Sequence, residues 1–138
     1  MATNLSIITD ALQDIGVIPE TGTASAEQGA HGIRKLNQMM ASWRDTDNID
    51  LGYFPQESLV AAIPIPDWAE LAVVSSLGVV LAPKYAATIT DAHIAVAGAF
   101  YSSMLRRVQL LQMQPSNLSH LPLGSGSYGY GYNINTDI

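Results

Sequence analysis

Apolar side chains recur every three or four residues between Ser25 and Trp43, which is the spacing of one face of an amphipathic helix. This face is formed by Ile33, Leu36, Met40 and Trp43. Ser25 and Gln28 are spaced to form a capping box, in which each side chain satisfies a free backbone N–H at the helix start. An apolar face of this length is unstable in water, so we expect the other segments to cover it.

A shorter helix is predicted upstream, where apolar residues repeat the same spacing of three, four and three. These residues are Leu5, Ile8, Leu12 and Ile15. Thr3 or Asn4 can cap the start of this helix, and Gly16 can end it, because glycine adopts the left-handed conformation at low cost. Only a short loop separates this helix from the next, so we expect the two to pack antiparallel.

The segment from Trp68 to Ala82 predicts a third helix that is apolar on nearly every side. Such a helix is stable only when other elements surround it, so we expect it to be the most enclosed element of the fold. Asp67 and Glu70 have the spacing of a capping box at its start, and Pro83 marks its end.

A fourth helix is predicted from Thr90 or Asp91 to about Gln112, with the most regular apolar spacing in the sequence. Its apolar positions are Ile94, Ala97, Tyr101, Met104, Val108 and Leu111. Earlier, residues 49–66 contain three prolines that exclude a helix interior, so we expect a small irregular or hairpin insertion there. The sequence therefore predicts a mainly α fold, an antiparallel bundle of about four helices that forms one domain over residues 1–112.

Residues 113–138 are rich in glycine, serine and proline, and we expect them to form an extended C-terminal arm. Fully extended, this arm would reach on the order of 85 Å. It carries three evenly spaced tyrosines, Tyr128, Tyr130 and Tyr132. Tyrosine suits a contact surface because it adds apolar area and a hydrogen-bonding tip while losing few rotamers. The pattern favours an interaction arm, and a disordered end that binds nothing is the alternative.

Charged residues make up only 13% of the chain, whereas hydrophobic residues make up 48%. A surface with so few charges is typical of a protein that associates with other proteins. The alternative is a monomer with an adhesive surface, which the composition favours less. The net charge of −6 disfavours tight binding along phosphates, although DNA could still pass by without sticking. The N-terminus lacks the features of a secretory signal, and the longest apolar run falls short of the ~20 residues that span a membrane. We therefore expect synthesis in a cytoplasm and no membrane partner.

The sequence offers no convincing catalytic, cofactor-binding or metal-binding constellation. The three histidines, His31, His93 and His120, lack the spacing of helical metal ligands, and no serine lies in the G-x-S-x-G pattern. The absence of cysteine excludes thiol chemistry. Spacing alone cannot show whether two of the 12 acidic residues converge in a cleft, as carboxylate-dependent hydrolysis of glycans requires.

The order of these features resembles the head-to-tail adaptor proteins of tailed phages, in particular the tail accessory, or packaged-DNA stabilising, family of short-tailed bacteriophages. In that family a first helix ends in a Leu-Gly-like pair, similar to Ile15-Gly16 here, and a second carries Leu-Asn-x-Met-x-x-Trp. The chain matches this second motif at Leu36, Asn37, Met40 and Trp43. It departs from the family over Asp45 to Pro66, which is short and proline-rich where relatives often carry a larger extended insertion.

The resemblance implies a structural virion protein at the head-tail junction, synthesised in the host cytoplasm. Family members form a homo-oligomeric ring, usually of twelve copies, that sits beneath the portal protein and helps to retain packaged DNA. The lower face of the ring receives the tail directly or through a nozzle protein, and DNA passes through the lumen without sequence-specific binding. The C-terminal arms contact the portal, and we expect this role here for Leu118, Leu121, Leu123, Tyr128, Tyr130 and Tyr132.

Two other functions stay open on the sequence alone. One is a carboxylate-dependent hydrolase that acts on cell-wall glycan during infection. The other is a small helical module that binds an unrelated partner. Both use the same helices, so the fold by itself does not separate them from the adaptor.

Overall fold

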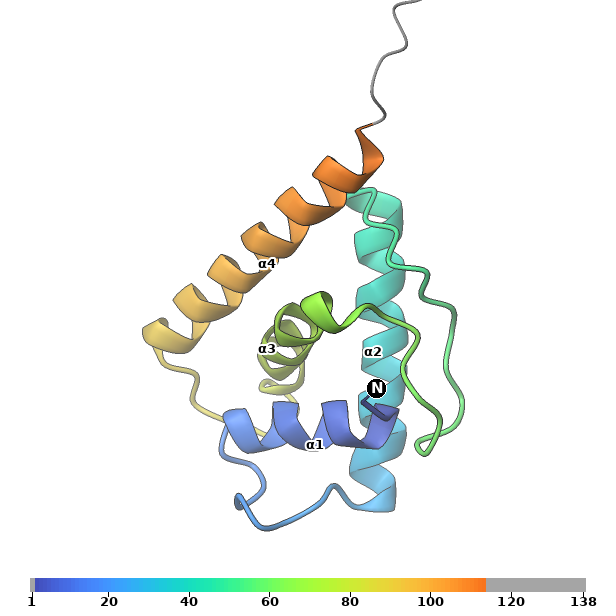
Figure 1. Cartoon of the computed structure of the whole chain (residues 1–138). Helices are drawn as coiled ribbons and strands as arrows, with labels where there is room; N and C mark the ends of the chain where they lie inside the picture. Colours follow the sequence, from blue (N-terminus) through green and yellow to red (C-terminus); the bar gives the residue numbers. More distant parts are fainter. Residues whose placement is uncertain (1, 114–138) are drawn as a thin grey trace, which may run out of the picture.

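The computed structural model describes residues 2–113, which form α-helices and no β-strand (Figure 1). The mainly α prediction is therefore confirmed. The elements are α1 (Asn4–Asp14), α2 (Ala26–Thr46), a 3-10 turn η1 (Asp67–Ala69), α3 (Glu70–Leu81) and α4 (Asp91–Gln112). The predicted arm falls on residues 113–138, so all but its first residue lies outside the described residues, and the division into domain and arm stays a prediction.

Side chains cap three of these helices as their sequences predict. The Thr3 hydroxyl accepts a hydrogen bond from the backbone N–H of Ser6, the third residue of α1, at 3.2 Å. Ser25 and Gln28 form the expected reciprocal box at the start of α2, and the Thr90 side chain caps α4. Each cap satisfies a backbone donor that has no partner within its own helix.

The predicted capping box at the start of α3 is wrong. Pro66 occupies the position before the 3-10 turn, and no side chain there makes a capping hydrogen bond. Asp67 is already the first residue of that turn, so its side chain cannot take the place of a cap. Asp67 and Glu70 still lie near the positive end of the helix dipole, which carboxylates stabilise.

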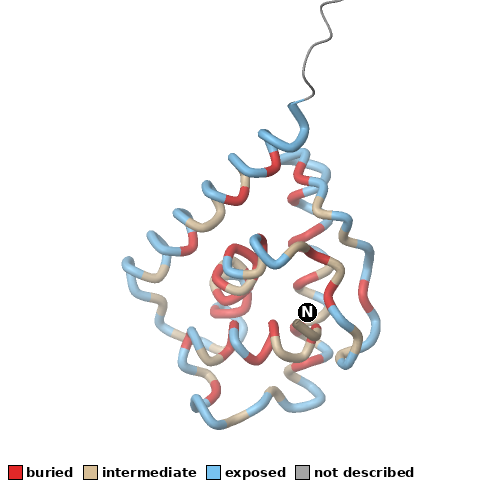
Figure 2. The backbone as a smooth tube through the Cα atoms, viewed as in Figure 1, coloured by how far each residue is buried: buried red, intermediate tan, exposed pale blue. Residues whose placement is uncertain are grey.

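Helix α3 occupies the centre of the fold and contacts α1, α2 and α4. Figure 1 shows it almost end-on, with α1 lying across the lower part of α2 and α4 running obliquely on the other side. Buried residues are dense along α3 (Figure 2), and they include Ala72, Val73, Leu77 and Leu81. The prediction that this apolar segment is enclosed by the other helices is therefore confirmed.

Helix α4 packs mainly against α3 and is buried only in its middle. Met104 and Val108 are buried, whereas Ile94 is 51% exposed and Leu111 is 64% exposed. At the C-terminal end the reason is length, because α4 has 22 residues and α3 has 12. The last turns of α4 therefore extend beyond α3, whereas Ile94 lies beside α3 at the edge of an open groove.

The insertion between α2 and α3 is an irregular loop that runs along the outside of α2 (Figure 1). It pairs with the start of the chain through an isolated bridge between Thr3 and Ala62. The backbone N–H of Leu5 donates to the carbonyl of Leu59 at 2.8 Å, and that of Asn4 to the carbonyl of Ala61 at 3.0 Å. The insertion thus contains one short extended segment, which pairs with the N-terminal residues and does not form a hairpin within the insertion.

Gly32 of α2 packs closely against α1, and this contact can be tested by substitution. A Cβ added at Gly32 would lie 2.5 Å from Cγ2 of Ile8, which is fully buried. We expect Gly32→Ala to lower the free energy of unfolding by about 1–2 kcal/mol, because overpacking outweighs the helix propensity of alanine. Gly98→Ala is the control, since an added Cβ there meets nothing within 4 Å, and it should raise stability by about 0.5–1 kcal/mol. Urea denaturation measures both, and equal effects would contradict the close approach of α1 and α2.

Candidate functional site

Three of the four motif residues on α2 belong to the core. Leu36, Met40 and Trp43 are buried and lie in the cluster that unites the helices. Trp43 lines the groove beside α3 and α4, whereas Met40 lines the cavity under the insertion. These three side chains therefore act through packing.

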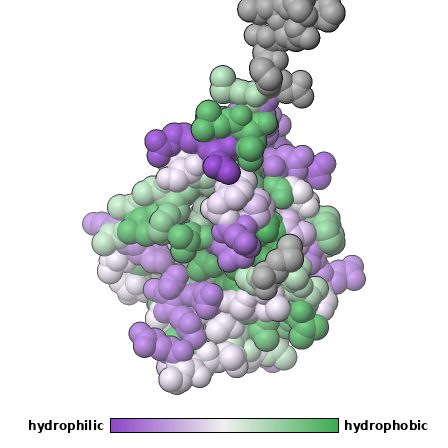
Figure 3. Space-filling view, in the orientation of Figure 1, coloured by the Kyte–Doolittle hydropathy of each residue, from purple (hydrophilic) through white to green (hydrophobic). Residues whose placement is uncertain are grey.

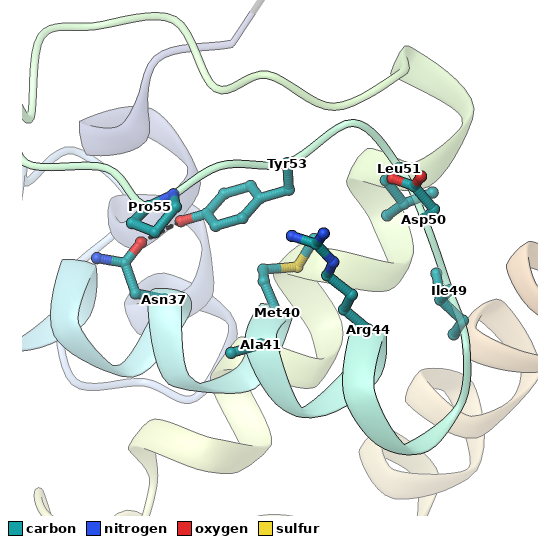
Figure 4. Close-up of a pocket in the computed structure, with 9 residues that line it drawn as sticks. All are labelled: Asn37, Met40, Ala41, Arg44, Ile49, Asp50, Leu51, Tyr53 and Pro55. Atoms are coloured by element: carbon teal, nitrogen blue, oxygen red, sulfur yellow. Dashed lines mark hydrogen bonds between the residues drawn. The ribbon is translucent and has the colours of Figure 1, made fainter.

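Asn37 is the polar member of the motif, and it holds the insertion against α2. Its Nδ2 donates to the backbone carbonyl of Gln56 at 2.9 Å, and its Oδ1 accepts from the backbone N–H of the same residue at 2.9 Å. The Tyr53 hydroxyl also donates to this oxygen (Figure 4). Burial raises the pKa of Tyr53 to about 12, so the donor keeps its proton at neutral pH. The amide of Asn37 thus satisfies both backbone groups of Gln56, as a neighbouring strand would.

Gln56 extends this connection to α1. Its side chain is buried, and its Oε1 accepts from Nδ2 of Asn4 at 3.0 Å. Asn4 also donates to the backbone carbonyl of Ser58 at 2.7 Å. One glutamine therefore joins the first helix, the motif helix and the insertion. The sequence analysis missed Gln56, because a polar residue between loop prolines has no periodicity that would mark it as buried.

Trp43 connects the motif helix to α4. Its ring packs edge-on against the ring of Tyr101, with 5.3 Å between the centroids. The Tyr101 hydroxyl donates to the carboxylate of Asp47, and burial together with this contact raises the pKa of Tyr101 to about 12. Further along, Nε2 of Gln112 donates to the backbone carbonyl of Asn48 at 3.1 Å. The last turns of α4, from which the predicted arm departs, are thereby fixed beside the end of α2.

A small cavity lies between the motif helix and the insertion (Figure 4). Its volume of about 80 Å³ is far below that of typical ligand sites, and its lining is mostly apolar. Arg44 and Asp50 are the charged residues that line it. The arrangement offers no pair of groups for acid–base catalysis at one buried centre.

Exposed apolar side chains gather along α4. Figure 3 shows apolar surface next to the grey trace, where α4 ends. Leu110, Leu111 and Met113 are exposed there, and Ile94 and Val96 are exposed near the other end of the helix. An open groove of about 330 Å³ lies between α4, α3 and α2, and it is lined largely by apolar residues. They include Met39, Trp43, Val79, Val80, Ile94 and Tyr101.

A second groove, of about 340 Å³, lies between α1 and α3 and differs in character because carboxylates line it. They belong to Asp10, Asp14, Asp67 and Glu70. The pKa of Asp14 is raised, chiefly by desolvation, with a further contribution from Asp10 that the nearby His93 opposes. The sequence could not reveal this convergence, because it joins residues more than fifty positions apart.

The described part of the chain shows neither a metal site nor a membrane-spanning helix. No group of three or more histidines and carboxylates there is arranged to hold a metal ion. No helix among residues 2–113 is both long enough and apolar enough to span a bilayer. The His31 ring packs against Tyr85, while His120 lies outside the described residues together with the predicted portal-binding leucines and tyrosines.

A model of one protein family, described as P22 tail accessory factor, matches residues 1–136. The chain belongs to the P22 tail accessory factor family. The expected resemblance to short-tailed phage adaptors is therefore confirmed. The chain is a structural accessory protein of the bacteriophage tail, and membership in the family implies association with the virion. A comparison with curated proteins found no match.

The motif asparagine of this tail accessory factor can be tested directly. We expect Asn37→Ala to lower the free energy of unfolding by about 2–3 kcal/mol, because it leaves the N–H and carbonyl of Gln56 without partners. Gln38→Ala is the matched control, since Gln38 is exposed on the same helix, and it should change stability by less than about 0.5 kcal/mol. Hydrogen exchange at the Gln56 amide should accelerate only in the Asn37 variant. Unchanged protection would show that this contact does not hold the insertion.

Proposed function

We propose that this tail accessory factor is the head-to-tail adaptor, a homo-oligomeric ring between the portal and the tail. The observation that carries this proposal is the open surface of α4. Of its 22 residues only Ala97, Met104 and Val108 are buried. Such an extended, weakly charged surface is typical of one that other protein covers.

The composition of α4 supports a contact between protein subunits. Between Ala92 and Leu105 the helix carries no Asp, Glu, Lys or Arg. Grooves flank it on two sides, and one of them is lined mostly by apolar residues. Helix surfaces left uncovered by the core in this way can form the contacts of a ring, for which the family resemblance implies twelve copies.

The C-terminal arm, residues 113–138, is proposed to bind the portal. The described structure supports this at the point of departure, where Leu110, Leu111 and Met113 extend the apolar surface to the start of the arm. The Gln112–Asn48 hydrogen bond fixes that point on the body. Contact with the portal is assigned to Leu118, Leu121, Leu123, Tyr128, Tyr130 and Tyr132, and the opposite face receives the tail or nozzle.

DNA retention follows from the place of the ring below the portal. The net charge of −6 lets DNA pass through the lumen without sticking, since tight binding needs clustered cations that release counterions. The adaptor would thus retain DNA by closing the channel with bound protein and would make no sequence-specific contact.

Removal of the arm separates folding from attachment. We expect the protein truncated after Met113 to keep its helical circular dichroism and its thermal midpoint, because the buried cluster lies within the described helices and the insertion. It should no longer sediment with portal-bearing heads. A full-length variant with Tyr128, Tyr130 and Tyr132 changed to alanine controls for arm length and should bind more weakly than wild type. Undiminished binding by the truncated protein would contradict the role of the arm.

The carboxylate groove gives a specific reason to test the second candidate function, hydrolysis of cell-wall glycan. A general acid in such a reaction needs a raised pKa, and that of Asp14 is raised. The groove is open, however, and Asp10, Asp14 and Asp67 are exposed to solvent. The adaptor is therefore the better-supported function.

Peptidoglycan digestion distinguishes the two candidates. We expect the purified protein to release no reducing ends from peptidoglycan between pH 4 and pH 8, because the groove is open and most of its carboxylates are exposed to solvent. Lysozyme serves as the positive control. Release of reducing ends by the wild type, lost in a folded Asp14→Asn variant, would establish the enzyme instead.

A further inference from the structure

Half of the six basic residues gather at one place, around His31 on α2. Arg34 and Lys35 follow His31 by three and four residues, so they lie on the same side of the helix. The His31 ring packs edge-on against Tyr85, with 6.1 Å between centroids, and Nζ of Lys84 lies 5.9 Å from the centre of the Tyr85 ring. Burial and these three cations together lower the pKa of His31. We name Arg34, Lys35 and Lys84 the cationic face.

The groove between α1 and α3 has the opposite character. Its rim carries Asp10, Asp14, Asp67 and Glu70, and none of the described residues that line it is basic. Its apolar lining includes Leu71, which is 61% exposed although it lies on the central helix. Such a groove combines an apolar contact with a cluster of carboxylates, and we name it the acidic groove.

The two surfaces lie on different sides of α1. Gly32 of α2 packs against Ile8, which shows the side of α1 that faces α2. Asp10 follows Ile8 by two residues, so it lies about 200° further around the helix. The cationic face and the acidic groove of one copy therefore point in different directions, and they are free to contact two different neighbours.

We propose that the acidic groove of one copy binds the cationic face of the next copy. This inference rests on the proposed ring, and it names the surfaces that join adjacent copies. Three cations then meet four carboxylates, and Leu71 supplies an apolar contact beside them. A contact between two different patches repeats head to tail, which generates a ring when the rotation closes.

The observations favour a second copy over other occupants. A phosphate backbone would contact only the cationic face and would leave the acidic groove unexplained in a protein of net charge −6. A metal ion is disfavoured because no group of three potential ligands in the described residues is arranged to hold one. A second copy accounts for both surfaces at once, because each compensates the other.

Charge reversal tests the pairing with full-length protein and portal-bearing heads. One variant carries Lys35→Glu and Lys84→Glu, and the other carries Asp14→Lys and Glu70→Lys. We expect each variant alone to load onto heads at least about tenfold less than wild type, because like charges then oppose each other. An equimolar mixture should recover to within about twofold of wild type, because alternating copies restore every pair. Glu20→Lys with Glu57→Lys is the control, since both residues are exposed and lie outside the acidic groove, and it should load normally.

Each result has a definite meaning once circular dichroism shows that the variants are folded. Normal loading by either single variant, or no recovery in the mixture, overturns the pairing. Failure of the wild type to bind the heads at all would overturn the adaptor function instead.

Zero-length carbodiimide cross-linking of wild-type particles gives a second test that requires no variant. Particles assembled from equal amounts of ¹⁴N- and ¹⁵N-labelled protein should yield mixed-label links from Lys35 or Lys84 to the carboxylates of the acidic groove. Loaded particles without such links would overturn the pairing.

Discussion

The central helix α3 is apolar on nearly every side, and the rest of the structure depends on covering it. Helices α1, α2 and α4 each take part of its surface, and the buried side chains of α3 contact all three. A helix of 12 residues cannot in turn cover one of 22, so the last turns of α4 extend beyond it. Leu71 of α3 is also exposed, where it lines the grooves towards α1 and α4. Surfaces suited to assembly thus arise from the core itself.

Local interactions explain why so much of this fold could be predicted from the sequence. Thr3, Ser25 and Thr90 act on backbone groups three residues away, so their roles are visible in a short window. Gly16, with a φ of +78°, follows the end of α1 for the same local reason. Asp67 is not the predicted cap because a 3-10 turn begins at that residue and Pro66 holds the capping position. Gln56 and the acidic groove were missed because both depend on segments that meet only in the folded chain.

The four residues of the family motif have two different physical roles. Leu36, Met40 and Trp43 supply buried area, and residues of similar shape could in principle do so as well. Asn37 differs, because only a side chain with both a donor and an acceptor can satisfy the N–H and the carbonyl of Gln56 together. The motif therefore encodes the position of the insertion as well as the core.

The contacts between α4 and the end of α2 also determine how the protein bears mechanical load. A pull applied at Met113 along the helix axis acts on Tyr101, Met104, Val108 and Gln112 together, since all four hold α4 to the body. A force in this direction must break these packing contacts and hydrogen bonds together. A force perpendicular to the helix would break them one after another. The C-terminal end of α4 would therefore resist tension along the helix axis far better than any single hydrogen bond could.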